Sequence, residues 1–109
     1  MQDTIKIVIY ETPRKRRPFT KWFDSLDAHL QRLVAVRLDR VSLGNFGDCD
    51  LLKEGLWELR IHLGPGYRIY FGKRGNTLVI ILTGGTKKSQ PKDIEKALEY
   101  WKSYKEQHG

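Results

Sequence analysis

The alternation of hydrophobic and polar residues changes its period several times along this chain. Residues 5–10 place isoleucine at every odd position, and this period of two with β-branched side chains predicts a strand. Residues 12–18 hold two prolines and four consecutive cations, which are incompatible with a central strand and unfavourable in a helix. We therefore expect an exposed linker after the first strand.

Three segments have the spacing of three and four residues that is typical of amphipathic helices. The first covers residues 18–26 and opens on Pro18, which suits a first helical turn. The second covers residues 27–43 and ends at Gly44, a residue common at helix C-termini. The third opens near Ser89, and its apolar positions are Ile94, Ala97, Leu98, Trp101 and Tyr104.

Three strands are predicted between the second and third helices, over residues 57–63, 67–71 and 77–83. Turns at residues 64–66 and 73–76 are short enough to make these strands an antiparallel meander. The last strand is apolar throughout, as expected for a strand buried on both faces. We interpret the glycine-rich residues 84–88 as a loop.

The predicted order is therefore β-α-α-β-β-β-α, an α+β fold with a mainly antiparallel four-stranded sheet. The first strand must join that sheet, because an isolated strand would leave its backbone groups unpaired. Two N-terminal helices cover one face, and the C-terminal helix packs on the core or on a partner. A length of 109 residues predicts a single domain over residues 1–109.

The charge of the chain narrows the choice of partner. Lys and Arg number 20 against 13 Asp and Glu, which gives a net charge of +7 and favours a polyanion, usually a nucleic acid. An acidic protein and a membrane surface remain alternatives on charge alone. One cysteine, no signal-peptide pattern and no long apolar run lead us to expect a cytoplasmic protein without a membrane span.

Candidate chemistry lies on the polar face of the meander. Side chains alternate across a strand, so Glu58, Arg60 and His62 share one face, as do Arg68 and Tyr70 on the next strand. Matching the apolar faces requires Arg60 to lie opposite an even-numbered residue, such as Arg68 or Tyr70. Facing cations repel, and a bound phosphate would relieve that repulsion. The alternative is a solvated sheet face on which Glu58 pairs with one arginine.

This arrangement suggests phosphodiester cleavage in which the 2′-OH of RNA is the nucleophile, a reaction that needs proton transfer and charge stabilisation but no metal or cofactor. The two arginines would hold the phosphate, Glu58 or His62 would move protons, and Tyr70 would position a base or ribose. Lys87 and Lys88 would add charge near the end of the last strand, unless they only solvate a loop.

Two further groups of cations are candidates for contacts with the RNA backbone. One is the run Arg14, Lys15, Arg16 and Arg17, for which a solvated linker is the alternative. The other is the pair Lys73 and Arg74 in the predicted turn.

Four segments together resemble a known family. Leu56–Arg60, Gly66–Tyr70, Leu82–Lys88 and Asp93–Ala97 are similar, in order, to the phage-derived, HigB-like addiction-module killer proteins of the RelE/ParE toxin superfamily. The resemblance implies a RelE-like fold and a toxin–antitoxin system, in which a cognate antitoxin, often a HigA-like helix-turn-helix protein, neutralises the toxin. For the RelE and HigB branches it also implies an mRNA interferase, an endoribonuclease that cuts mRNA on the ribosome and inhibits translation.

The resemblance assigns some residues and leaves one position open. Arg60 and Arg68 match basic positions on the two central strands of RelE-like toxins, and Lys87 or Lys88 matches a basic position after the last strand. RelE has a catalytic tyrosine soon after that position, whereas this chain has Ser89–Lys92 there and no tyrosine before Tyr100. Proton transfer then uses another group, or the activity differs. A ParE-like toxin that inhibits DNA gyrase without cutting RNA and a degraded prophage relic are the alternatives.

Overall fold

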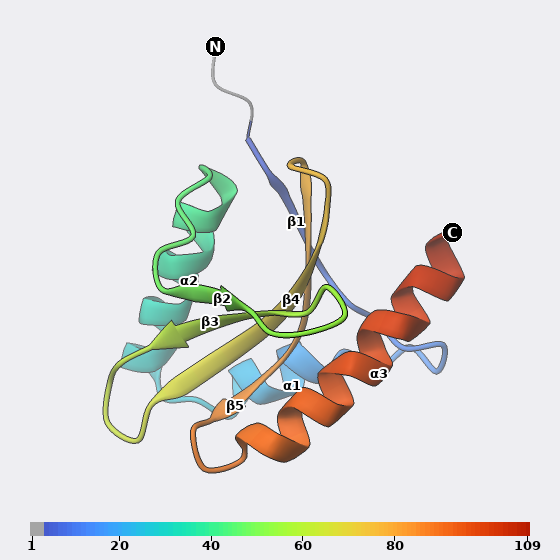
Figure 1. The fold of residues 1–109 in the computed structure, drawn as a ribbon. Coiled ribbons are helices and arrows are strands. Elements are labelled where there is room, and N and C mark those ends of the chain that lie inside the picture. The colour runs from blue at the N-terminus through green and yellow to red at the C-terminus, as the bar shows by residue number, and fades with distance from the viewer. Residues whose placement is uncertain (1–3) are drawn as a thin grey trace.

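The computed structural model describes residues 4–109, and Figure 1 shows how their helices and strands are arranged. The elements are β1 (Lys6–Ile9), α1 (Pro18–Asp24), α2 (Ala28–Ser42), β2 (Cys49–Leu51), β3 (Trp57–Ile61), β4 (Tyr67–Arg74), β5 (Leu78–Thr86) and α3 (Gln90–His108). The α+β class is confirmed, and each predicted helix and strand is present.

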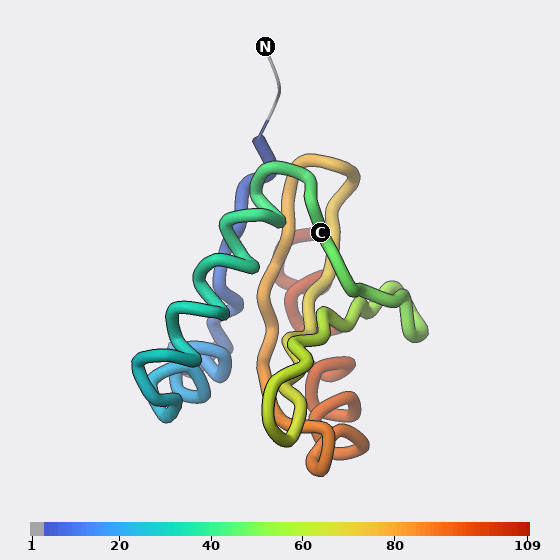
Figure 2. Tube along the Cα trace, turned by 90° about the vertical axis from the view of Figure 1, so that its left-hand side faces the viewer, coloured from blue at the N-terminus to red at the C-terminus, as the bar shows by residue number. Residues whose placement is uncertain are grey.

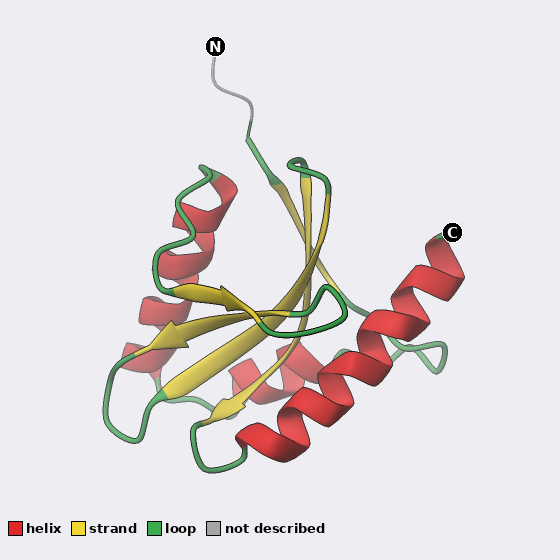
Figure 3. Cartoon of the chain, viewed as in Figure 1, coloured by secondary structure: helices red, strands yellow, loops and turns green. Residues whose placement is uncertain are grey.

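The sheet has five strands in the order β1-β5-β4-β3-β2. Only β1 is parallel to its neighbour, β5, so the prediction of a mainly antiparallel sheet is confirmed. The prediction of four strands is wrong, because the short edge strand β2 pairs with β3 (Figure 3). Three residues are too few to give a periodic pattern. A turn closed by the Leu52 N–H donating to the Leu56 carbonyl at 2.8 Å brings β2 beside β3.

Two strands run further than the sequence predicts. Lys73 and Arg74 belong to β4, and Gly84, Gly85 and Thr86 belong to β5, where they pair with Ile69, Arg68 and Tyr67 respectively. Glycine is depleted in strands, which is why residues 84–86 resemble a loop in the sequence. Pairing with β4 keeps them extended.

Helices cover both faces of the sheet. Figure 2 shows α1 and α2 on one side and α3 on the other. One core cluster joins Phe19 of α1 and Val34 of α2 to the sheet, and a second joins Ala97 and Trp101 of α3 to the opposite face. The C-terminal helix therefore packs on the core of this chain. None of the helices within residues 4–109 has the length and apolar character needed to cross a lipid bilayer.

Two consecutive glycines in β5 let both helical layers approach the sheet closely. A Cβ atom built on Gly84 would collide with the Trp22 ring of α1, and one built on Gly85 would collide with the Asp93 carboxylate of α3. Successive residues of a strand face opposite sides, so the strand has no side chain on either face at this point. The positions of α1 and α3 beside β5 depend on that pair.

Candidate functional site

The predicted pair of arginines lies on one face of the sheet. Arg60 pairs directly with Arg68 across β3 and β4, which settles the register that the sequence left open. A guanidinium nitrogen of each donates to the same oxygen of Glu58, at 3.2 Å from Arg60 and 3.1 Å from Arg68. The repulsion between the two cations is thus relieved by Glu58 without a bound phosphate.

Two more carboxylates neutralise Arg60. Asp48 and Asp50, just before and within β2, lie 2.7 and 2.8 Å from its guanidinium. These carboxylates raise the pKa of Arg60, and hydrogen bonds from Arg60 and His62 lower the pKa of Asp48. Three carboxylates against two guanidinium groups make this charge cluster (Asp48, Asp50, Glu58, Arg60 and Arg68) net negative by one.

Part of this face is closed to solvent. Glu58 is 1% exposed and Tyr70 is 0% exposed, because α3 covers them and Gln90 donates to Glu58 at 2.7 Å. Burial and the negative charge of Glu58 raise the pKa of Tyr70. The alternative of a solvated face is therefore wrong for these two residues, although its pairing of Glu58 with an arginine is present.

The other predicted catalytic side chains lie at one end of the sheet. Ile61 pairs with Tyr67, and Tyr67 with Thr86, so the chain segments that follow β3 and β5 leave the sheet at the same end, on either side of β4. His62 follows β3, is exposed and is paired with Asp48. Lys87 and Lys88 follow β5 and are exposed.

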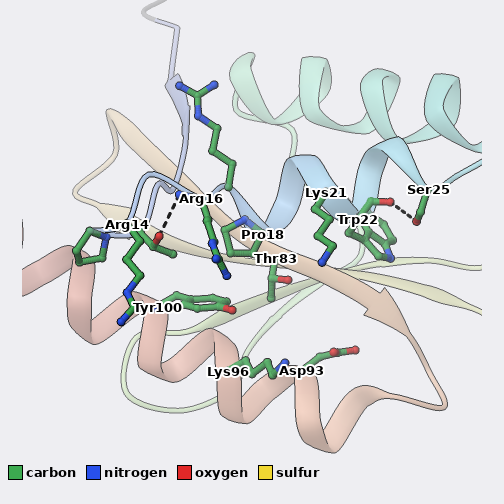
Figure 4. Close-up of a pocket in the computed structure, with 13 residues that line it drawn as sticks. Arg14, Arg16, Pro18, Lys21, Trp22, Ser25, Thr83, Asp93, Lys96 and Tyr100 are labelled. Atoms are coloured by element: carbon green, nitrogen blue, oxygen red, sulfur yellow. Dashed lines mark hydrogen bonds between the residues drawn. The ribbon is translucent and has the colours of Figure 1, made fainter.

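A larger feature, which we call the basic groove, opens between α1 and α3. Its volume is 1010 Å³. Figure 4 shows the segment before α1 at one end, Lys21 and Trp22 projecting from α1, and Asp93, Lys96 and Tyr100 projecting from α3. The lining residues are Thr12, Pro13, Arg14, Arg16, Arg17, Pro18, Lys21, Trp22, Ser25, Thr83, Asp93, Lys96 and Tyr100.

The segment at the end of the groove has a defined conformation. The Thr12 N–H donates to the Arg16 carbonyl at 2.8 Å, and the Lys15 N–H donates to the Thr12 carbonyl at 2.8 Å. The Thr12 hydroxyl accepts from the Arg16 N–H at 3.1 Å, and Lys15 takes a φ of 65°. This closed turn places Arg14, Arg16 and Arg17 along the groove, whereas Lys15 is not among its lining residues.

The groove combines cations with aromatic rings. Arg14, Arg16, Arg17, Lys21 and Lys96 supply five positive charges, and among the lining residues of the described chain Asp93 is the one acid. Arg17 is 3.2 Å from Glu11, and both side chains are partly exposed to solvent. Unlike the charge cluster, this surface therefore keeps most of its positive charge.

One tyrosine in the groove has a supported ring. Tyr100 packs against Tyr10 with ring centroids 5.3 Å apart, and burial raises the pKa of Tyr100. Its hydroxyl therefore stays protonated at neutral pH and does not repel an anion.

A second depression continues the positive surface past the start of α3. It has a volume of 530 Å³ and is lined by Thr86, Lys88, Ser89, Pro91 and Lys92. The Ser89 hydroxyl donates to Asp93, which lines the basic groove, so one hydrogen bond links the walls of the two depressions at the start of α3. Of the two loop lysines predicted from the sequence, Lys88 lines this second depression, and neither lines the basic groove.

The remaining predicted RNA contacts lie elsewhere. Lys73 packs over aromatic rings, 4.7 Å from that of Phe46 and 5.0 Å from that of Trp57. Arg74 lies 5.8 Å from the ring of Tyr104. Neither lines the basic groove.

Sequence reasoning missed the helical walls of the groove, although a signal was present. Asp93, Lys96 and Tyr100 are three and four residues apart and so share one face of α3. Lys21 of α1 and Ser25, the residue that caps the C-terminus of this helix, stand in the same relation. These faces lie beside the apolar stripes of the two helices. The sequence does not show that they line the same groove, because that depends on how the helices pack on the sheet.

Comparisons with known proteins place most of the groove within a shared region. A family model described as "Phage derived protein Gp49-like (DUF891)" matches residues 21–102. A protein of Haemophilus influenzae (strain ATCC 51907 / DSM 11121 / KW20 / Rd) that carries the name "Uncharacterized protein" is 40% identical over 80 residues, or 72% of this chain and 81% of that protein. The family match includes the groove residues from Lys21 to Tyr100 and leaves out those from Thr12 to Pro18, among them three of the five cations.

Proposed function

This chain belongs to the phage-derived Gp49-like family, and from that premise we propose that it is the toxin of a toxin–antitoxin pair and that it binds and cleaves messenger RNA. The observation that carries this proposal is the basic groove, where five cations from three chain segments face a volume of 1010 Å³ with little compensating charge. The proposed partners are translating ribosomes and a cognate antitoxin.

The groove has the chemistry that single-stranded RNA needs. Arginine and lysine side chains neutralise phosphates, and aromatic rings stack on unpaired bases. Trp22 and Tyr100 lie among the cations, so the groove offers contacts for the phosphate and for the base of a nucleotide. In the charge cluster, by contrast, carboxylates already neutralise both arginines.

Cleavage would take place where the strand leaves the groove. The second depression, with Lys88 and Lys92, lies beside the Ser89–Asp93 hydrogen bond, and the end of β3, with His62, lies at the same end of the sheet. In the proposed reaction the 2′-oxygen attacks the adjacent phosphorus and loses its proton to a base. The 5′-oxygen leaves with a proton, and the products are a cyclic phosphate and a 5′-hydroxyl end.

His62 is the best-placed candidate for the proton transfer. It is exposed and bound to Asp48, whereas Glu58 and Tyr70 are buried. A carboxylate bound to one imidazole nitrogen fixes which nitrogen faces the substrate. Lys87 and Lys88 would stabilise the charge that develops on the phosphoryl oxygens.

The decisive experiment is induction of the chain in translating cells, followed by mapping of the 5′ ends of mRNA. We expect new ends in phase with codons, and the same cuts when the purified chain is added to purified ribosomes engaged on mRNA. Intact mRNA together with altered DNA supercoiling would overturn the proposal in favour of a gyrase inhibitor.

Matched variants connect the activity to the groove. The triple variant Arg14→Ala, Arg16→Ala, Lys21→Ala should lower the cleavage rate about tenfold or more, because it removes three contacts to phosphates. The control Arg32→Ala, Lys53→Ala, Lys102→Ala removes the same charge from exposed positions outside the groove and should stay within about twofold. Equal losses in both variants would contradict the groove as the RNA site.

A further inference from the structure

Asp93 is an acidic residue in a groove that is otherwise lined by cations, aromatic rings and uncharged side chains. It lies on the wall formed by α3, beside Lys96 and across from Lys21, and is the one acid among the lining residues that the structure describes. A carboxylate repels a phosphate. Asp93 stands in the first turn of α3, where a carboxylate favours the helix N-terminus, and in a groove that holds RNA it also suits a part of the nucleotide that donates hydrogen bonds.

The Asp93 carboxylate is held in place. Its Oδ2 accepts from the Ser89 hydroxyl, the Asp93 N–H donates to the Ser89 carbonyl at 3.0 Å, and the side chain rests on Gly85. No residue in the described range 4–109 donates a hydrogen bond to its Oδ1. A fixed carboxylate with a free oxygen can accept from a ligand at little cost in entropy.

Two other side chains continue the same line along α3. Lys96 and Tyr100 follow Asp93 at helical spacing, and all three project into the groove (Figure 4). At a rise of about 1.5 Å per residue the three span about 10 Å, comparable to one dinucleotide step of an unstacked strand. Along this line the carboxylate can accept hydrogen bonds from the edge of one base, the ammonium group can bind a phosphate, and the aromatic ring can stack on the face of a second base.

We propose that Asp93, Lys96 and Tyr100 form a dinucleotide subsite that selects guanine in single-stranded RNA. Tyr100, supported by Tyr10, stacks on one base, Lys96 binds the phosphate, and Asp93 accepts from the Watson–Crick edge of the next base. Guanine presents two N–H donors side by side on that edge, N1–H and the N2 amino group, which suits a carboxylate. The other three bases present one donor group each. This inference rests on the proposed function, since it assumes that the groove binds RNA.

The experiment is fluorescence anisotropy with labelled five-nucleotide RNAs that differ only at the central position, made with 2′-O-methyl groups so that they resist cleavage. We expect the guanine oligomer to bind about tenfold tighter than the uracil oligomer, the size of one good bidentate contact. Asp93→Asn keeps the shape of the side chain and should abolish this preference while binding the uracil oligomer at least as well.

Two further variants separate the subsite from general effects. Tyr100→Ala should weaken binding of all four oligomers by about tenfold, as loss of one stacking contact predicts, and Tyr100→Phe should restore it. Glu99→Gln, an exposed acid of α3 outside the groove, should leave the preference intact.

The outcomes distinguish the two proposals. Binding of all four oligomers with equal affinity, or a guanine preference that survives Asp93→Asn, would overturn the subsite and leave the RNA-binding groove standing. Absence of binding to every oligomer, together with intact mRNA in cells, would overturn the proposed function itself.

Discussion

The charge cluster and the basic groove both contain arginines that stand out in the sequence, yet they have opposite electrostatic character. In the cluster, Arg60 and Arg68 are surrounded by carboxylates and largely covered. In the groove, Arg14 and Arg16 are solvated and face Lys96 across open space. An arginine in the sequence can therefore be assigned to an anion site only after the carboxylates around it are known.

The largest effect should come from breaking the charge cluster. Glu58→Ala leaves Arg68 without its carboxylate in a mostly buried position, and the loss of one partner from a buried ion pair costs about 3–5 kcal/mol. We expect the free energy of unfolding, measured by urea denaturation, to fall by that amount. Glu95→Ala on the exposed surface of α3 is the control. A loss below about 1 kcal/mol would mean that the cluster does not stabilise the fold.

The groove should respond in the opposite way, with a change in binding and none in stability. The triple variant Arg14→Ala, Arg16→Ala, Lys21→Ala should leave the free energy of unfolding within about 0.5 kcal/mol, as is usual for exposed positions. The slope of log affinity for single-stranded RNA against log salt should become shallower by about 2, at about 0.7 per phosphate contact. An unchanged slope would show that these cations do not contact the backbone.

The smallest expected effect is on the pH dependence of stability and comes from Asp48, a partly exposed carboxylate of the charge cluster. Hydrogen bonds from Arg60 and His62 hold the pKa of Asp48 below its usual range in the folded state, and an unfolded aspartate titrates near about 3.9. Asp48 therefore stabilises the fold above about pH 4, and this contribution is lost as the pH falls through the lower folded pKa. Urea denaturation between pH 7 and pH 2 should show a smaller acid loss for Asp48→Asn than for the parent chain. Identical pH profiles would contradict the pairing.

Most of the fold follows from local patterns, and the error in the site follows from one short strand. The helices, the meander and the pairing of Arg60 with even-numbered residues of β4 were predictable from period and turn length. The three residues of β2 were not, because so short a strand has no period of its own. Since Asp48 and Asp50 come with β2, missing it also meant missing the charge that neutralises Arg60.

The groove was half predictable. The run of cations before α1 is visible in the sequence, and three of its four members line the groove. Its walls depend on tertiary packing, since α1 and α3 line the same groove only because both pack against β5. The burial of Glu58 likewise depends on where α3 crosses the sheet, which no local pattern specifies.

Because Gly84 and Gly85 of β5 carry no side chains, the width of the groove does not depend on the side chains that line it. Both walls are spaced by main-chain atoms, whose thickness is the same whatever side chains the walls carry. Substitutions of Lys21, Lys96 or Tyr100 can therefore change which ligand is preferred while the aperture keeps its width. Relatives with the same two glycines would keep the same spacing between α1 and α3 and would differ in the ligands that they bind.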